Sequence, residues 1–327
     1  MFVISCQFIE KYYVGVIANG GDNFSKGDLI MRKVLLATTA LVAITGVTAA
    51  NADISISGNY EWEYTSYDTG STFGSDSHIT IKAVNAADNG MTFTAVTVLG
   101  NGDLDSNHIK VDGDFGTVYL GDVDGNSAAS LMDGALGRNK DIEGQGGLGS
   151  EATHSGTADT AVFLDGGADI IYMTPSIGGL KLGIGADLTD SDASVTDGAV
   201  DMAVSYSMSG INLYAGGTSG QEFDESNFGL STSLAGLTIG VGSRSEGGTS
   251  KAKSNDVGLQ YTLANGIKIA GLSASGTGRN GTTKVKASNL GASYPVVPGV
   301  KLNAESGVLT VGGVDSNYTW VAVNMSF

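Results

Sequence analysis

The sequence is poor in cysteine, proline, aromatic residues and positive charge. Its 327 residues include one cysteine, three prolines, 7% aromatic residues, and 17 Lys+Arg against 34 Asp+Glu. A single cysteine, Cys6, cannot form an internal disulfide and excludes cysteine-based zinc sites. A net charge of −17 argues against a nucleic-acid partner, because a phosphate backbone binds a basic face. No apolar run reaches the ~18 residues of a membrane helix, which excludes a helical membrane protein.

Residues 31–52 have the three parts of a secretory signal peptide. The first part is a short basic start, residues 31–33 (Met-Arg-Lys). An apolar stretch that is too short for a membrane anchor follows at 34–47, and the third part, 48–52, consists of small residues of the kind that signal peptidase recognises. Since export signals stand at the start of a chain, we expect residues 1–30 to be a mistranslated leader before the true start, Met31. The mature chain, 53–327, would then be one cysteine-free domain with 13 basic and 31 acidic residues, a net charge of −18.

The mature chain alternates apolar and polar residues with a period of two. Ile54, Ile56 and Trp62 share one face of the first segment, and Val321 and Val323 share one face of the last. This period is typical of β-strands with one apolar and one polar face.

A repeat divides these strands. Glycine followed by an apolar-polar-apolar triplet opens a strand six times, at Gly90, Gly179, Gly210, Gly236, Gly266 and Gly299, each directly after a tight turn. Gly/Ser/Asp-rich stretches such as 189–198 and 244–254 predict long loops at the opposite strand ends. We therefore expect sixteen strands, short and long connections in strict alternation, both termini at the short-turn end, and closure of the first strand on the last.

The alternation alone also fits a soluble sandwich with its apolar faces packed together. Three features favour a membrane barrel: a polar face on every strand, an aromatic last residue on the apolar face, and aromatics near strand ends. These aromatics are Tyr60, Trp62, Tyr64, Tyr172, Tyr206, Tyr261, Tyr294 and Phe327.

Several segments resemble porins of Gram-negative bacteria. Residues 113–121 (Gly-Asp-Phe-Gly-Thr-Val-Tyr-Leu-Gly) resemble the fifth strand of general diffusion porins, and 168–180 the hairpin after their constriction loop. The exported start resembles alphaproteobacterial porins, and Val323, Met325 and Phe327 resemble the signal read by the outer-membrane insertion machinery. The resemblance implies an all-β, closed antiparallel 16-stranded transmembrane β-barrel in the outer membrane. It also implies a homotrimer, contact with outer-membrane lipid, and passage of small hydrophilic solutes.

The longest connection, 122–167, lies between these two motifs. The resemblance implies that this third loop folds into the lumen and constricts it, and a ~45-residue connection is uncommon unless functional. Against Arg138 and Lys140, it carries eight acids, of which we take seven as candidate constriction residues: Asp122, Asp124, Asp133, Asp141, Glu143, Glu151 and Asp159. The third loop therefore predicts moderate cation selectivity.

The positive side of the pore is expected on the wall. The three arginines of the mature chain, Arg138, Arg244 and Arg279, are expected in loops, and Glu222, Asp224 and Glu225 in another outer loop. Strand parity instead points five lysines inward, with Lys82, Lys110 and Lys181 as candidate wall residues beside Lys268 and Lys301.

Other chemistry receives little support from the sequence. Histidines are scattered and no serine stands in a Gly-x-Ser-x-Gly setting, so we expect no enzyme. No cofactor is expected, although acidic loops could hold Ca²⁺ loosely; Asp122, Asp124 and Asn126 resemble the opening of a calcium loop without its glycine. The alternatives to passive diffusion are a substrate-specific sugar channel, which needs an aromatic track in the lumen, and a soluble exported β-rich adhesin.

Overall fold

The computed structural model describes residues 52–123, 127–132, 168–188, 199–220, 223–248, 251–278 and 280–327. These ranges contain sixteen strands and one short helix, α3 (Ala128–Met132). The strands are β1 (Asp53–Tyr67), β2 (Gly70–Ala86), β3 (Thr92–Gly100), β4 (Asp103–Gly113), β5 (Gly116–Asp122), β6 (Ile170–Met173), β7 (Leu180–Ala186), β8 (Val200–Met208), β9 (Ile211–Ser219), β10 (Phe223–Leu234), β11 (Leu237–Gly248), β12 (Lys253–Thr262), β13 (Lys268–Thr277), β14 (Lys284–Val297), β15 (Val300–Val311) and β16 (Val314–Ser326). No helix in these ranges is long and apolar enough to cross a membrane.

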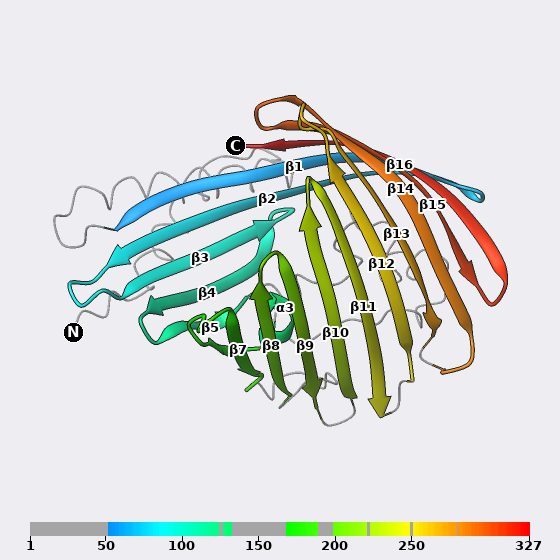
Figure 1. Ribbon diagram of the computed structural model, residues 1–327. Helices are drawn as coiled ribbons and strands as arrows, with labels where there is room; N and C mark the ends of the chain where they lie inside the picture. Colours follow the sequence, from blue (N-terminus) through cyan, green and yellow to red (C-terminus); the bar gives the residue numbers. More distant parts are fainter. Residues whose placement is uncertain are drawn as a thin grey trace, which may run out of the picture. The chain divides into compact units, whose positions relative to one another are not determined.

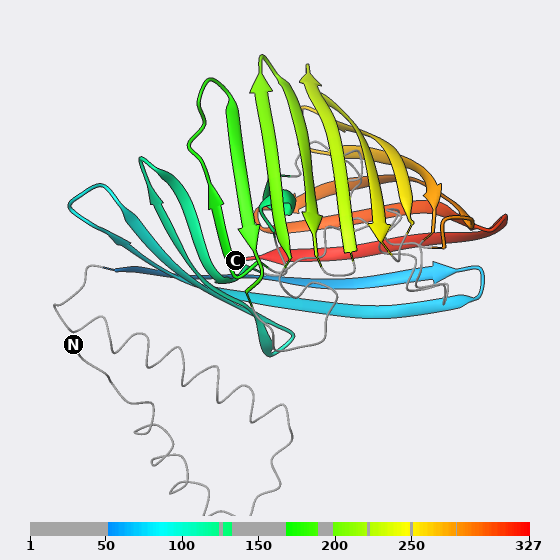
Figure 2. The same cartoon turned by 90° about the horizontal axis from the view of Figure 1, so that it is seen from below.

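The sixteen strands form one closed antiparallel barrel (Figures 1 and 2). Each strand pairs with its neighbours in sequence, and β1 closes the barrel by pairing with β16, with Glu61 opposite Asn324 and Trp62 opposite Val323. Closure leaves no unpaired sheet edge. The predicted strand number, order and closure are therefore confirmed.

Both termini of the barrel lie at one rim, which we call the terminal rim. The odd-numbered strands run from it toward the opposite, far rim, and the even-numbered strands return. The last residue, Phe327, extends β16 by exchanging two 3.0 Å backbone hydrogen bonds with Gly58 of β1.

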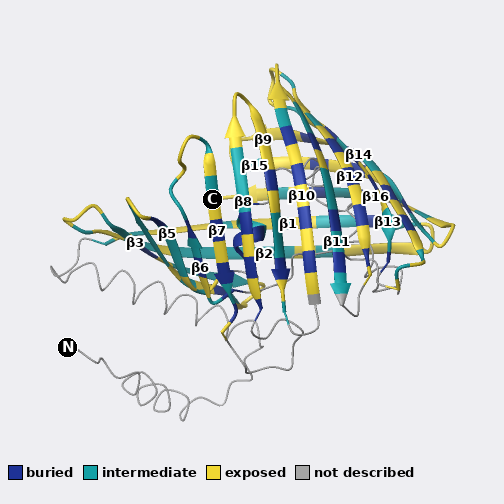
Figure 3. Ribbon diagram, turned by 60° about the horizontal axis from the view of Figure 1, so that its bottom comes forward, coloured by how far each residue is buried: buried dark blue, intermediate teal, exposed yellow. Residues whose placement is uncertain are grey.

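The two faces of the barrel wall differ in chemistry and in exposure. Large apolar side chains on the outward face are solvent-accessible, such as Ile56 (44% exposed), Leu182 (47%) and Leu259 (48%). Polar residues on the inward face include nearly buried ones such as Asp201 and Glu305. Buried and exposed residues alternate along the strands in Figure 3. An apolar belt around a closed barrel with a polar interior is the arrangement of a membrane barrel and not of a soluble sandwich.

The six glycines that were predicted to open strands all lie in turns at the terminal rim. Their φ angles fall between 80° and 90°, in the left-handed region that glycine adopts without strain. A Cβ on Gly179 would also lie 2.2 Å from the carbonyl oxygen of Ser207, so this turn has no room for a side chain.

The strict alternation of short and long connections is wrong. At the far rim, β1–β2, β3–β4 and β15–β16 are joined by two residues each, as tightly as at the terminal rim. In the segment 244–254, expected to be a loop, residues 244–248 instead belong to β11 and residues 253–254 to β12. The glycines and serines there carry little hydropathy contrast, so the strands extend further than their apolar pattern does.

Candidate functional site: the barrel lumen

The helix α3, at the start of the third connection, packs on the inward face of β6–β9 (Figure 2). The backbone N–H of Ala129 donates to Oδ1 of Asp201 on β8 at 2.9 Å, and the hydroxyl of Tyr214 on β9 donates to the carbonyl oxygen of Ala129 at 2.8 Å. Asp201 and Tyr214 are each only 3% exposed. The start of the third connection is thus hydrogen-bonded to the wall at two points.

Small residues on the wall make room for α3. A Cβ on Gly183 of β7 would lie 3.0 Å from both Ala128 and Met132. Ala203 and Ile171 complete the apolar seat on either side. Because Gly183 has no side chain, the helix can approach β7 closely.

Tyr214→Phe should loosen α3 without altering the barrel. The substitution removes one hydrogen bond and leaves the buried Ala129 carbonyl unsatisfied, which costs about 1 kcal/mol or more. We expect amide hydrogen exchange in α3 to accelerate about fivefold or more. Tyr206→Phe, on the outward face of the adjacent β8, is the matched control; equal exchange in the two variants would contradict this seat.

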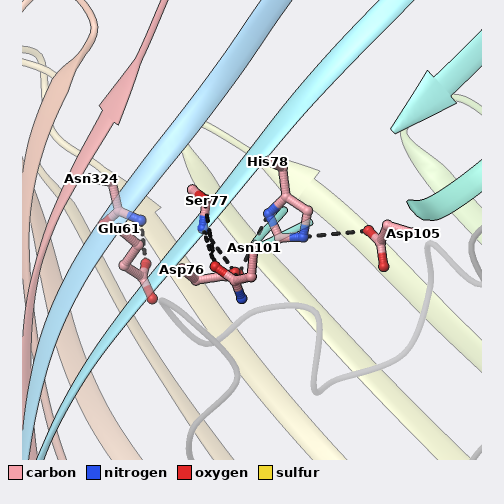
Figure 4. A network of polar contacts seen from close by, with 7 residues as sticks. All are labelled: Glu61, Asp76, Ser77, His78, Asn101, Asp105 and Asn324. Atoms are coloured by element: carbon pink, nitrogen blue, oxygen red, sulfur yellow. Dashed lines mark hydrogen bonds and ion pairs between the residues drawn. The ribbon is translucent and has the colours of Figure 1, made fainter. Parts of the chain in front are cut away.

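Carboxylates and amides line the wall where β16, β1 and β2 meet. Asn324 of β16 donates to Glu61 of β1 (Figure 4). Asn324 in turn accepts from Asn303 of the neighbouring β15 at 2.5 Å. On β2, Asp76 accepts from the side chain of Asn101 at 2.8 Å. These contacts hold polar side chains in place along the lumen.

His78 lies between two carboxylates in the same region. Its Nδ1 is 3.5 Å from Asp76 and its Nε2 is 3.4 Å from Asp105 (Figure 4). The three residues come from β2 and β4, and the β-bulge in β4 opposite Leu99 of β3 brings Asp105 into reach. This arrangement adds negative charge to the lumen wall.

Charged residues on the inward face are sorted along the barrel axis. The strands and register place all five lysines expected to point inward on the inward face, close to the terminal rim: Lys82, Lys110, Lys181, Lys268 and Lys301. Lys110 forms a 3.0 Å ion pair with Asp112, and its Nζ lies 5.9 Å from the ring centre of Tyr119. Inward carboxylates toward the middle and far rim are Glu61, Glu63, Asp76, Asp201, Glu225, Glu246, Asp256 and Glu305.

Two expectations about loop charges are wrong. Arg244 belongs to β11, faces inward opposite Asn227, and is 4% exposed. Asp224 and Glu225, expected in an outer loop, both lie in β10. Glu225 faces inward opposite Glu246 and is also 4% exposed, whereas Asp224 faces outward and is exposed. The far half of the wall therefore holds an arginine that the sequence placed elsewhere.

The described structure holds one of the candidate constriction acids. Asp122 is the last residue of β5 and is exposed; the register pairs it with Asn107. The other six lie outside the described residues: Asp124, Asp133, Asp141, Glu143, Glu151 and Asp159. Within the ranges that are described, no group of three or more acidic, histidine or cysteine side chains could hold a metal ion.

The predicted assembly residues lie together at the end of β16. Val323, Met325 and Phe327 are exposed on the outward face, and the Phe327 ring lies over Gly58 of β1. The terminal aromatic is thus available to another molecule although its backbone is paired.

Comparisons with known proteins agree with this architecture. A family model described as Gram-negative porin matches residues 37–312. None of the curated proteins matches the chain. The solved structure of an anion-selective porin from Comamonas acidovorans is similar, with a TM-score of 0.68 and 14% identity over 85% of this chain and 100% of that one.

Two further solved structures have the same fold. The trimer form of OmpT from Vibrio cholerae has a TM-score of 0.65 and 13% identity, over 84% of this chain and 99% of that one. A mutant of Rh. blastica porin has a TM-score of 0.64 and 18% identity, over 84% of this chain and 100% of that one. At these identities the likeness concerns the fold.

Proposed function

The chain belongs to the Gram-negative porin family and forms an outer-membrane channel; we propose that it passes ions and small hydrophilic solutes by passive diffusion, with moderate cation preference. The observation that carries this proposal is the closed sixteen-stranded barrel with charged side chains on its inward face and apolar ones outside.

The lumen favours passive diffusion over a substrate-specific sugar channel. An aromatic track for sugars needs rings that solutes can touch. Three inward rings, Tyr214, Tyr318 and Trp320, are 3%, 3% and 0% exposed. The inward rings of Tyr67 on β1 and Tyr119 on β5 are half-buried. These two rings lie on strands that are not neighbours and so form no continuous track, which supports a passage lined mainly by polar groups.

Single-channel recording in a planar bilayer tests the channel proposal. The purified protein should give stepwise conductance that rises with KCl concentration without saturating, because diffusion through a water-filled passage requires no tight site. Saturation at low concentration of one sugar, with block of ion current, would contradict passive diffusion. No insertion and recovery as a soluble monomer would contradict the channel itself.

The cation preference rests on charge. Six net negative charges are predicted in the third loop, and inward carboxylates of the described wall occupy the middle and far half of the barrel. The lysines near the terminal rim, Lys82, Lys110 and Lys181 among them, oppose this field locally. Ca²⁺ held loosely by the acidic loop would weaken the preference, and a chelator would then restore it.

We also propose a C3 homotrimer. The outward face of β1 near the joined termini, with Ile54, Ile56 and Gly58, supplies an apolar surface for a neighbouring barrel. Light scattering in mild detergent should give three times the mass of one chain. A single-chain mass would contradict this assembly.

Phe327→Ala should lower assembly far more than channel function. We propose that the exposed C-terminal ring is read by the outer-membrane insertion machinery, and the ring itself lies outside the lumen. The amount in the outer membrane should fall severalfold, whereas assembled channels keep their conductance. Leu234→Ala, equally outward and exposed (79%) in a turn-side position of β10, is the control.

Residues 31–52 are proposed as a signal peptide and 1–30 as a mistranslated leader. Sequencing the N-terminus of the exported protein should begin at Asp53. A start at Ala52 or earlier would move the cleavage site, and a start at Met1 would contradict both proposals.

A further inference from the structure

In the described strands, the outward-facing positive charges lie at one place. Of the nine bases in the described strands, only Lys253 of β12 and Lys284 and Lys286 of β14 face outward. All three are exposed and lie near the far rim. None of them takes part in an ion pair with another described residue. Since the chain has a net charge of −17, three exposed lysines together form an unusual positive patch, and a negatively charged group would complement it.

The three lysines flank β13, which lies between their strands (Figure 1). Thr277 pairs with Lys253 on one side and with Lys284 on the other, and Ser275 pairs with Lys286. Neighbouring strands are ~4.8 Å apart, so Lys253 and Lys284 are about 10 Å apart across β13. Two extended ammonium groups at that separation can reach one phosphate group between them, above the hydroxyls of Ser275 and Thr277.

An apolar groove continues from this patch toward the terminal rim. It has a volume of about 420 Å³ and follows the outward face of β11–β14. Its outward-facing lining is Leu237, Val257, Leu259, Tyr261, Ile269, Gly271, Ser273 and Leu290. Gly271 pairs with Leu259 and Leu290, and its missing side chain leaves the depression between those two leucines.

Groove and lysines form one continuous track along β13. From Gly271 the outward residues are Ser273, Ser275 and Thr277, so the surface changes from apolar to hydroxyl-bearing to basic. Six residues of strand span about 20 Å, somewhat more than the ~15 Å half-thickness of a hydrocarbon core. The order and the length match an acyl chain, its polar linkage and a charged head group.

We propose that the outward face of β12–β14 is a binding site for a phosphorylated lipid. The acyl chain lies in the groove over Gly271, and Lys253, Lys284 and Lys286 bind the phosphate. The site rests on the proposed function only in that this face lies in a membrane. The lumen and the third loop take no part in it.

Native mass spectrometry of the folded, full-length protein in detergent micelles tests the site. Dioleoyl phosphatidic acid is the probe, and dioleoylglycerol, which has the same chains and no phosphate, is the control. We expect retained phosphatidic acid and no retained dioleoylglycerol. Millimolar inorganic phosphate should not displace the lipid; displacement would indicate a site for free anions and overturn the proposal.

Two sets of lysine variants distinguish binding at this site from a general effect of positive charge on lipid binding. Lys253→Gln, Lys284→Gln and Lys286→Gln together should weaken phosphatidic acid binding roughly a hundredfold, since each lysine near a membrane surface contributes about fivefold. The matched triple Lys181→Gln, Lys268→Gln and Lys301→Gln, which faces the lumen, should leave binding within about twofold. Equal losses in the two triples would overturn the proposal.

A second variant fills the groove and keeps the lysines. Ser273→Trp should weaken binding of dioleoyl phosphatidic acid at least about tenfold, because the indole ring occupies the space of the acyl chain. Unchanged binding would contradict the assignment of the groove to the acyl chain and overturn the proposal. The outward triple should keep its bilayer conductance, so loss of lipid binding is distinguishable from loss of the channel. Dissociation of the oligomer by the outward triple would instead identify the patch as a subunit interface and overturn the lipid site.

Discussion

Replacing Asp133, Asp141 and Glu143 together by Asn, Asn and Gln should shift the zero-current potential in a KCl gradient toward anion preference. Opposite charges ~4 Å apart interact by about 1 kcal/mol in water and about 4 kcal/mol at an effective dielectric constant of 20. An ion in a narrow passage lies between these limits. We therefore expect the permeability ratio of K⁺ to Cl⁻ to fall about fivefold or more, with the largest change in dilute salt.

The control variant has to remove the same number of negative charges from positions outside the passage. Glu222, Asp224 and Glu225 do not qualify as a set, because Glu225 faces the lumen of β10 and is nearly buried. Asp88, Asp224 and Asp315 do, since they are exposed in a terminal-rim turn and on outward strand positions. Salt at physiological strength screens charges beyond about 8 Å, so this triple should shift the ratio much less. Equal shifts would assign selectivity to general surface charge.

The barrel could be predicted from the sequence because its signals are local and repeated. The alternation at Ile54 and Ile56 specifies which face of β1 is apolar, and the turn glycines fix where strands begin. A one-residue error in register would turn the whole apolar face of a strand toward the lumen. These signals can be recognised even where the difference in hydropathy between the two faces of a strand is modest, as in β12 and β14.

The same signals fail where both faces are small or polar. Ser243, Arg244 and Ser245 alternate across β11, yet serine on both sides of arginine has the composition of a loop. Their strand character comes from pairing with β10 and β12, which local hydropathy does not encode. This is why Arg244 was expected in a loop and lies on the wall.

The seat of α3 was missed for a related reason. Asp201 and Tyr214 are 72 and 85 residues from the backbone atoms of Ala129 that they hold, and no spacing in the sequence joins them. One signal was present: Tyr214 is a large aromatic at an inward position between Asn212 and Gly216. A ring on the polar face of a strand indicates that something packs against it from inside the barrel.

Trp320→Ala should be the most destabilising single substitution in the described wall. Trp320 is fully buried on the inward side of β16, packs with Tyr318, Ala322 and Tyr67, and donates its indole N–H to Glu63 on β1 at 2.7 Å. Truncating a buried tryptophan costs about 3–5 kcal/mol, and the substitution also removes the partner of the Glu63 carboxylate across the closing pair of strands. The midpoint of urea unfolding, followed by the heat-modifiable gel shift, should fall accordingly.

The second tryptophan of the chain provides the matched control. Trp62 belongs to the same β1–β16 pair but faces outward and is 41% exposed, beside Phe73 at 5.9 Å. Its replacement by Ala removes partial burial only, so we expect a loss below about 2 kcal/mol. If Trp62→Ala destabilised the barrel as much as Trp320→Ala, the closing strands would be held by their contact with lipid. The expected order instead assigns that role to the inward cluster, because only Trp320 combines complete burial with a hydrogen bond that joins the last strand to the first.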